Sequence, residues 1–293
     1  MHKSGFVNII GNPNVGKSTL MNALVGEKLS IITSKAQTTR HRIMGIVSGE
    51  DFQIVYSDTP GILKPSYKLQ ESMMKFVTGA VTDADVILYV TDTVEQGDRS
   101  AEIIGRIRES GIPTVVVINK IDLSTPEALN ALVDKWRQEL PEAQIVPASA
   151  KENFNIEGLF KTILALLPEG PAFYPKETLT DKTLRFFASE IIREKILKFY
   201  DKEIPYCCEI EIDSYREEPT IDRIAATIYV ARDSQKGILI GHKGEKLKRV
   251  GQTAREDMEE FLGKKVFLQL FVKVSDDWRN NERQLRRFGY ELE

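Results

Sequence analysis

The segment Gly11–Ser18 (GNPNVGKS) limits what this chain can fold into more than any other feature, because it matches the G-x-x-x-x-G-K-[ST] pattern of phosphate-binding loops. The apolar run Phe6–Ile10 before it predicts a strand, and Lys17–Val25 after it predicts a helix. This is the context in which the pattern binds phosphates; a glycine-rich turn that arose by chance is the alternative. We expect loop N–H groups to face the β-phosphate, Lys17 to supply charge to the β- and γ-phosphates, and the Ser18 hydroxyl to bind Mg²⁺.

Short apolar runs and helical patterns alternate from Phe6 to about Leu167. Such alternation predicts βαβ units, and therefore an α/β domain with a mostly parallel sheet. Phosphate chemistry would then lie at the carboxyl ends of the strands. The expected strands are Phe6–Ile10, Gln53–Ser57, Val86–Thr91, Thr114–Asn119 and Gln144–Pro147.

A second motif, NKID, begins at Asn119 and ends at Asp122. A carboxylate only accepts hydrogen bonds, so Asp122 matches the N1–H and 2-amino donors of guanine, which adenine lacks. Asn119 and Lys120 would brace the loop and cover the base and ribose, while Ala148–Ala150 (ASA) would offer a backbone N–H to guanine O6. N-K-x-D alone is weak evidence, and Asp122 could be an ordinary loop residue. In series with the phosphate loop and the ASA segment, it predicts GTP and GDP as ligands.

A third motif, DTPG, follows the second expected strand and runs from Asp58 to Gly61. Asp58 would hold Mg²⁺ through water, and the Gly61 N–H would bond the γ-phosphate. Upstream, the polar segment Ser34–His41 contains Thr38 and Thr39, of which we favour Thr39 as the residue that closes onto Mg²⁺; a solvated loop is the alternative. These motifs predict two loops that GTP orders and hydrolysis releases.

The residue after DTPG is Ile62, not the glutamine that orients the attacking water in many GTPases. We therefore expect slow intrinsic hydrolysis unless backbone, a partner or an ion holds the water. Asn14 is a candidate ligand for K⁺ beside the phosphates, and a plain turn residue is the alternative. The predicted catalytic residues are Lys17, Thr39, Asp58 and Gly61, and the predicted metal ligands are Ser18, Thr39 and Asp58. The predicted nucleotide contacts are Gly11, Asn12, Pro13, Asn14, Val15, Gly16, Lys17, Ser18, Thr19, Asp58, Gly61, Asn119, Lys120, Asp122, Ser149 and Ala150.

Charge and cysteine usage narrow the class of protein. The net charge of −3 gives no general attraction to nucleic acid or anionic membranes, so any such binding needs a local patch. The only cysteines, Cys207 and Cys208, are adjacent and cannot link distant segments, which favours a reducing compartment. No zinc-ligand spacing can be assembled, and no stretch approaches the roughly 18 apolar residues of a membrane span. We expect a cytoplasmic protein.

The length of 293 residues predicts two domains. The segment Pro168–Lys182 has three prolines, one glycine and no periodicity, which is typical of a linker. We expect a first domain over residues 1–170, a linker over 171–182 and an α+β domain over 183–293. The apolar stripe of its first helix fits packing on the domain's own sheet better than a membrane. The expected elements are Thr183–Tyr200, Cys207–Arg216, Ile221–Arg232, a short helix into Gly241, Glu245–Leu262 and Lys265–Ser275.

At the centre of this second domain, Gly241–Gly244 (GHKG) forms a GxxG loop between two predicted helices. Two glycines let a nucleic-acid backbone approach closely, and Ile238–Ile240 could offer an apolar floor to unstacked bases. Between Arg232 and Arg249, six lysines or arginines face two acids, so a basic patch exists. A turn with solvated lysines is the alternative; the α-β-β-α-α-β order favours single-stranded RNA binding. The predicted RNA contacts are Lys236, Ile238, Ile240, Gly241, His242, Lys243, Gly244, Lys246 and Arg249.

Together, GNPNVGKS, QTTRH (Gln37–His41), DTPG, NKID, ASA and GHKG closely resemble the Era family of bacterial GTPases, and the similarity extends into the tail Trp278–Tyr290. The resemblance implies a P-loop GTPase domain followed by a type II KH domain. It further implies binding to the 3′ end of 16S ribosomal RNA, assistance in maturation of the small ribosomal subunit, a monomer, and a cytoplasmic location with peripheral association at the inner membrane face. An apolar residue after DTPG is normal in that family.

Two other functions compete with this interpretation. One is a related GTPase of tRNA modification or cell signalling, in which the second domain docks a protein; GTP-dependent RNA binding separates the two. The other is a non-catalytic RNA-binding adaptor that uses nucleotide only as a structural ligand. The adaptor is less consistent with the presence of Lys17, Ser18 and Asp58, which are residues of a catalytic site. A phosphate-release assay distinguishes the adaptor from the GTPase.

Overall fold

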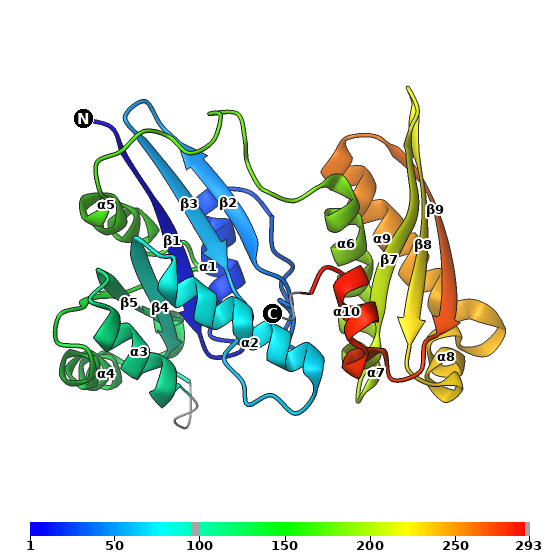
Figure 1. Cartoon of the computed structure of the whole chain (residues 1–293), viewed down its shortest axis with the longest axis horizontal. Helices are drawn as coiled ribbons and strands as arrows, with labels where there is room; N and C mark the ends of the chain where they lie inside the picture. The colour runs from blue at the N-terminus through cyan, green and yellow to red at the C-terminus, as the bar shows by residue number, and fades with distance from the viewer. Residues whose placement is uncertain (95–99, 291–293) are drawn as a thin grey trace. The chain divides into compact units, whose positions relative to one another are not determined.

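The structure is a computed structural model that describes residues 1–94 and 100–290. The chain divides into two compact units (Figure 1). The first unit comprises Met1–Pro65 and Met73–Asp181, and the second comprises Ser66–Ser72 and Lys182–Glu293.

The first unit is built on a six-stranded sheet with the order β2-β3-β1-β4-β5-β6. All neighbours pair in parallel except β2, which is antiparallel to β3. The mostly parallel α/β fold is therefore confirmed, and β2 is an edge strand that the sequence did not reveal. The strands are β1 Lys3–Gly11, β2 Ile43–Ser48, β3 Phe52–Asp58, β4 Val86–Asp92, β5 Thr114–Asn119 and β6 Gln144–Pro147.

Helices cover both faces of this sheet, which explains why every residue of β4 and β5 is buried. α2, α3 and α4 pack on one face around Tyr89 and Trp136, whose ring centroids are 5.1 Å apart. α1 and α5 lie on the opposite face (Figure 1). The helices are α1 Lys17–Val25, α2 Lys68–Thr82, α3 Ala101–Ser110, α4 Pro126–Glu139 and α5 Ile156–Leu166.

Residues 168–181 lie along the first unit, although their sequence is typical of a linker. The buried Gln53 side chain on β3 accepts hydrogen bonds from the N–H groups of Phe173 (2.7 Å) and Tyr174 (2.9 Å). It also donates to the Tyr174 carbonyl (2.8 Å). Further along, Thr180 forms an antiparallel bridge with Gly45 of β2. Most of the expected linker is thus fixed to the first unit by Gln53 and the edge of β2.

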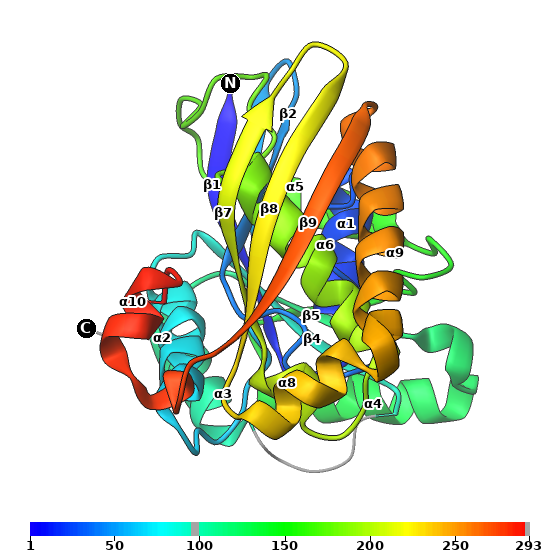
Figure 2. The ribbon, with the colours of Figure 1, turned by 90° about the vertical axis from the view of Figure 1, so that its right-hand side faces the viewer.

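The second unit has an α+β fold around a three-stranded sheet with the order β7-β8-β9, in which β8 is antiparallel to β7 and parallel to β9. Figure 2 shows α6 and α9 on one side of this sheet. The elements are α6 Leu184–Phe199, α7 Ile204–Cys207, β7 Glu209–Glu217, β8 Ile221–Val230, α8 Asp233–Ile240, α9 Glu245–Leu262, β9 Lys265–Val274 and α10 Glu282–Arg287.

The core of the second unit accounts for the apolar stripe of α6. Ile192 and Ile196 are fully buried against the inner face of the sheet and α9, so the stripe packs within the unit as expected. Leu184, at the start of the stripe, is exposed. One boundary needs correction: Cys207 ends the short helix α7 instead of opening a strand, because a helical turn with Pro205 in it runs from Ile204 to Cys207. α10 was not anticipated.

Candidate functional site

The loop between β1 and α1 needs glycine at its two ends, Gly11 and Gly16. Gly16 has φ 94°, and a β-carbon on it would stand 2.3 Å from Nδ2 of Asn119. A β-carbon on Gly11 would stand 2.1 Å from the carbonyl oxygen of Val90 on β4. The loop is therefore packed against its neighbours at both of these glycines. It leads directly into the N-terminus of α1, whose first backbone N–H groups can bind an anion.

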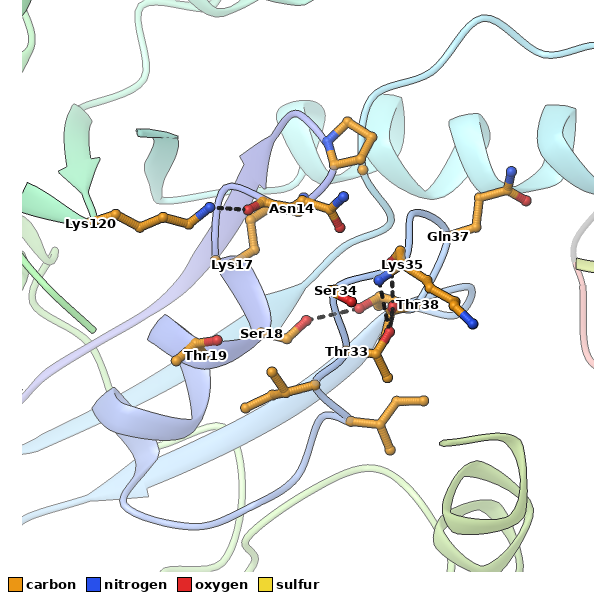
Figure 3. A pocket seen from close by; sticks show the side chains of 16 residues that line it. Asn14, Lys17, Ser18, Thr19, Thr33, Ser34, Lys35, Gln37, Thr38 and Lys120 are labelled. Atoms are coloured by element: carbon orange, nitrogen blue, oxygen red, sulfur yellow. Dashed lines mark hydrogen bonds between the residues drawn. The ribbon is translucent and has the colours of Figure 1, made fainter. Parts of the chain in front are cut away.

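Lys17, the first residue of α1, is 6% exposed and turns back over the loop. Its Nζ donates hydrogen bonds to the carbonyls of Gly11 (3.0 Å) and Asn12 (2.9 Å). Figure 3 shows Lys17, Ser18 and Thr19 along one side of a cavity of about 380 Å³, within the usual size range of ligand pockets. The predicted loop residues Pro13, Asn14 and Gly16 line the same cavity.

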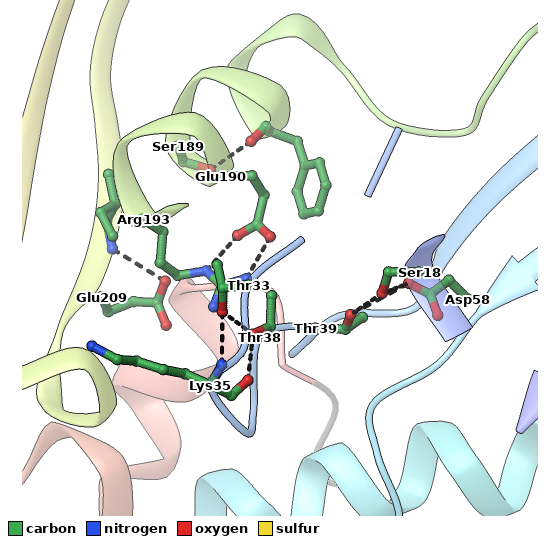
Figure 4. A network of polar contacts seen from close by, with 12 residues as sticks. Ser18, Thr33, Lys35, Thr38, Thr39, Asp58, Ser189, Glu190, Arg193 and Glu209 are labelled. Carbon is green, nitrogen blue, oxygen red and sulfur yellow. Dashed lines mark hydrogen bonds and ion pairs between the residues drawn. The ribbon is translucent and has the colours of Figure 1, made fainter. Parts of the chain in front are cut away.

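The three predicted metal ligands contact one another (Figure 4), and Ser18 and Thr39 line the cavity. The Ser18 hydroxyl donates to Oδ2 of Asp58 (2.6 Å) and lies 2.9 Å from the Thr39 hydroxyl, which also bonds Oδ2 (3.3 Å). Burial raises the pKa of the Asp58 carboxyl, whereas the Ser18 hydrogen bond and the Lys17 charge lower it.

These residues fit Mg²⁺. The other oxygen of Asp58, Oδ1, is buried and has no hydrogen-bond partner in the described part of the chain. A buried carboxylate oxygen without a donor is costly unless a cation or water satisfies it, and Mg²⁺ takes oxygen ligands from one or two carboxylates, hydroxyls and water. The Thr38 hydroxyl instead donates to the Lys35 carbonyl (2.6 Å) within its own loop, which agrees with our preference for Thr39.

The DTPG segment is hydrogen-bonded to the end of β1, where the phosphate loop begins. The Thr59 hydroxyl donates to the Ile9 carbonyl (2.7 Å), and the Ile62 N–H donates to the Gly11 carbonyl (3.1 Å). These bonds hold Gly61 against the backbone of Pro13. The Ile62 side chain is buried in the core of the first unit, so it does not take part in orienting water.

The NKID loop is braced from two sides. Asn119 donates from Nδ2 to the Val15 carbonyl (2.9 Å), which ties the loop to the phosphate loop. Lys120 donates to the Asn14 carbonyl (2.5 Å) and pairs with Asp92 (2.6 Å). Both side chains therefore brace the site as predicted from their positions.

Asp122 is exposed, and the Ser149 hydroxyl donates to its Oδ1 (2.6 Å). Ser149 thus orients the carboxylate through its side chain, a role that the sequence did not suggest. The N–H groups of Ala148, Ser149 and Ala150 donate to Ile118, Phe154 and the Asn119 side chain within the protein. Guanine O6 would have to share or replace one of these bonds.

The sequence missed part of the cavity wall. Ile31, Ile32 and Thr33 line the cavity just before the segment Ser34–His41, and Ser34 and Lys35 line it from within that segment. The Thr33 hydroxyl lies 2.6 Å from that of Thr38 and accepts the Lys35 N–H (3.1 Å), so these residues form a compact turn. The mixed apolar and polar run before Ser34 carried no recognisable motif.

The GxxG loop of the second unit joins α8 to α9. Gly241 and Gly244 have φ of 73° and 80°, and a β-carbon on Gly241 would stand 2.7 Å from the Lys246 side chain. His242 and Lys243 are exposed at its tip. Ile238 is exposed and Ile240 partly so, but Leu239 is fully buried in the core, so it cannot form part of an apolar floor. Lys236 is half-buried on α8.

A groove of about 410 Å³ continues from this loop between α9 and β9. The residues that line it are Gly244, Leu247, Lys248, Gly251, Gln252, Arg255, Leu268 and Leu270. Apart from Gly244, none was predicted, although the α9 members recur at the three- and four-residue spacing of one helix face. The predicted Lys246 and Arg249 instead lie over the rings of Tyr200 (5.9 Å) and Phe199 (4.2 Å).

Comparison with known proteins agrees with both units. A family model described as a 50S ribosome-binding GTPase matches residues 6–120, and a KH-domain model matches residues 203–279. GTPase Era of Alkaliphilus metalliredigens (strain QYMF) is 46% identical over 99% of both sequences. GTPase Era of Staphylococcus haemolyticus (strain JCSC1435) is 45% identical over 99% of this chain and 97% of its own.

The chain belongs to the Era family of GTPases.

Solved Era structures match the whole fold. Era in complex with MgGDPNP and nucleotides 1506–1542 of 16S ribosomal RNA is 41% identical, with a TM-score of 0.95 and complete coverage of both chains. A single-residue variant of Aquifex aeolicus Era bound to GDP·AlF4⁻ has the same identity and TM-score, and the match covers 99% of this chain and 100% of that one.

As an Era-family GTPase, the chain hydrolyses GTP with Mg²⁺, which neutralises charge on the phosphates when bound. The phosphate loop and Lys17 are placed to hold the phosphates, and residue 62 supplies no polar group to the water. Among residues 1–94 and 100–290, no three His, Cys, Asp or Glu side chains gather as a metal site, and no helix could cross a membrane.

Proposed function

We propose that this chain is a GTP-hydrolysing switch that binds the 3′ end of 16S ribosomal RNA through its second unit and assists maturation of the small ribosomal subunit. The observation that carries the proposal is the GxxG loop, whose two glycines with positive φ present His242 and Lys243 beside the α9–β9 groove. An Era structure that is 41% identical was solved with this RNA and a GTP analogue, which supports the same ligands here.

The groove has the chemistry of a single-strand site. Leu247, Leu268 and Leu270 give apolar surface for unstacked bases, and Lys248 and Arg255 add positive charge along α9. KH domains clamp about four nucleotides of backbone against a GxxG loop and read splayed bases beside it. The negative net charge of the chain excludes nonspecific attraction as the main source of affinity, so the local patch must supply it.

Crosslinking to cellular RNA, with and without a non-hydrolysable GTP analogue, tests this function. We expect the 3′ end of 16S ribosomal RNA to be the main crosslinked species, with a yield that depends on the nucleotide. Enrichment of tRNA, or no RNA, would favour the GTPase of tRNA modification or signalling. A preparation that binds RNA but releases no phosphate from GTP would favour the adaptor.

We also propose an oligomeric state and a cellular location for this chain. Both rest on its resemblance to the Era family. A monomer in the cytoplasm, with peripheral association at the inner face of the membrane, fits that family. Sedimentation analysis should give a mass near 33.2 kDa. Flotation with anionic vesicles tests the membrane association, and recovery of all protein in the unbound fraction would contradict it.

K⁺ is a further proposed ligand. Asn14 is exposed at the cavity with φ 65°, and its carbonyl accepts a hydrogen bond from Lys120. An ion beside its side chain would add positive charge near the β- and γ-phosphates. Equal rates of GTP turnover in K⁺ and in Na⁺ would contradict K⁺ binding at this site.

A further inference from the structure

The face of the β7–β8–β9 sheet that points away from α6 and α9 carries an aromatic and basic row. On β9, every second residue from Lys265 to Lys273 is exposed, whereas Val266 is buried and Leu268 and Leu270 line the groove. In Figure 2 no helix crosses this face over β9, whereas α10 contacts Tyr229 of β8 through Arg287. The outward row, which we call the β9 outer row, consists of Lys265, Phe267, Gln269, Phe271 and Lys273.

Both phenylalanines of the row are exposed. Phe267 is 43% exposed and Phe271 is 50% exposed. At about 3.3 Å per residue, their rings stand roughly 13 Å apart along the strand, with the amide of Gln269 between them. Two aromatic planes separated by a hydrogen-bonding side chain and flanked by lysines match a single-stranded nucleic acid, whose bases stack on aromatic rings while cations contact its backbone.

The neighbouring strand β8 borders both rings. In the sheet register Ala225, which is partly exposed, lies beside Gln269. Thr227, which is fully buried and donates to Asp213 (2.7 Å), lies beside Phe271. Arg223 lies beside Phe267 and holds its guanidinium 5.4 Å from the ring centroid. Arg223 also donates to Glu218 (2.9 Å), so the pair offers a base a planar guanidinium that is already ion-paired.

We propose that the β9 outer row is a second contact surface for single-stranded RNA, on which Phe267 and Phe271 each stack one unpaired base. Side chains of β9 alternate between the two faces of the sheet, so the row and the groove lie on opposite faces of this strand, and β9 is an edge strand. An RNA strand that leaves the groove reaches the row by crossing one strand edge. The inference rests on the proposed RNA-binding function and extends its site beyond the GxxG loop.

The test compares two RNAs. A four-nucleotide RNA fills the GxxG site alone, and a twelve-nucleotide RNA of the 16S 3′ end is long enough to reach the row. Phe267→Ala/Phe271→Ala should weaken binding of the long RNA about tenfold or more, and leave affinity for the short RNA within about twofold. Phe267→Tyr/Phe271→Tyr should bind both RNAs like the parent, whereas Phe267→Leu/Phe271→Leu should behave like the alanine variant.

Controls separate this inference from the proposed function. Phe261→Ala removes a phenylalanine of α9 with the same 43% exposure and should change neither affinity. Lys273→Gln should lower the salt slope of long-RNA binding by about 0.7. If the parent binds neither RNA, the proposed function fails. If the parent binds both but the alanine variant keeps parental affinity for the long RNA, the second surface is overturned, and a protein becomes the better occupant of the row.

A spectroscopic measurement gives an independent answer. Phe271→Trp places an indole at an exposed position, while the native Trp136 and Trp278 are 4% and 0% exposed. The long RNA should quench the fluorescence of this variant markedly more than that of the parent, because a base stacks on the indole. The short RNA should quench the fluorescence of the variant no more than that of the parent. Equal quenching in variant and parent would contradict stacking at Phe271.

Discussion

Gly61 lies against the phosphate loop so closely that a β-carbon on it would stand 2.8 Å from both the nitrogen and the Cα of Pro13. The Ile62 N–H to Gly11 bond (3.1 Å) holds the two segments together. DTPG and GNPNVGKS are therefore in direct backbone contact at Gly61 and Pro13.

Gly61→Ala should slow GTP hydrolysis about 10- to 100-fold, because the added methyl group displaces the N–H that we assign to the γ-phosphate, and small misplacements of catalytic groups carry costs of that size. Single-turnover phosphate release measures this. Gly79→Ala is the matched control, since a β-carbon on that α2 glycine meets nothing within 4 Å. Parental hydrolysis in Gly61→Ala would remove Gly61 from the site.

Asp122→Asn should lower GTP affinity roughly 100-fold and shift preference toward xanthine nucleotides, because an amide no longer offers the acceptor pair that guanine needs. Competition binding with GTP and xanthosine triphosphate measures the shift. Asp134→Asn, an exposed aspartate of α4, makes the same change away from the cavity. Unchanged GTP preference in Asp122→Asn would refute the assignment.

Gln53→Ala should destabilise the first unit by about 2–3 kcal/mol, because the N–H groups of Phe173 and Tyr174 and the Tyr174 carbonyl lose a buried partner. Calorimetry should show its transition lowered by roughly 4–10 °C. Gln144→Ala at the exposed start of β6 is the control. A transition within about 1 °C of the parent would mean that Gln53 does not fix the connecting segment.

Local patterns were enough to predict the elements whose own residues decide them. α1, β5, β6 and α9 have the predicted bounds, because the glycine motifs and continuous apolar runs mark both ends. β2 was missed because Ile43–Ser48 is short, contains Gly45, and becomes a strand through its pairing with β3. The fixed segment 168–181 was missed because its composition is typical of a linker.

The functional site was likewise predictable only where neighbouring residues in the sequence determine it. Motif residues such as Lys17, Asp58 and Asp122 were identified individually, because each motif implies its chemistry. Contacts made across the fold were not: the Ser149 hydroxyl on Asp122 and the Leu268 wall of the groove depend on how distant segments pack. Gln53 was a usable signal, since a glutamine inside an apolar strand needs buried partners.

RNA affinity of His242→Asp/Lys243→Asp tests the central claim most directly. Two carboxylates at the tip of the GxxG loop would repel the RNA backbone where it comes closest, so affinity for a single strand matching the 16S 3′ end should fall more than about 100-fold. GTP affinity should stay parental, and any stimulation of hydrolysis by RNA should disappear. Lys161→Asp, an exposed charge reversal on α5, should leave RNA binding intact. Parental RNA affinity and salt dependence in the double variant would contradict the account.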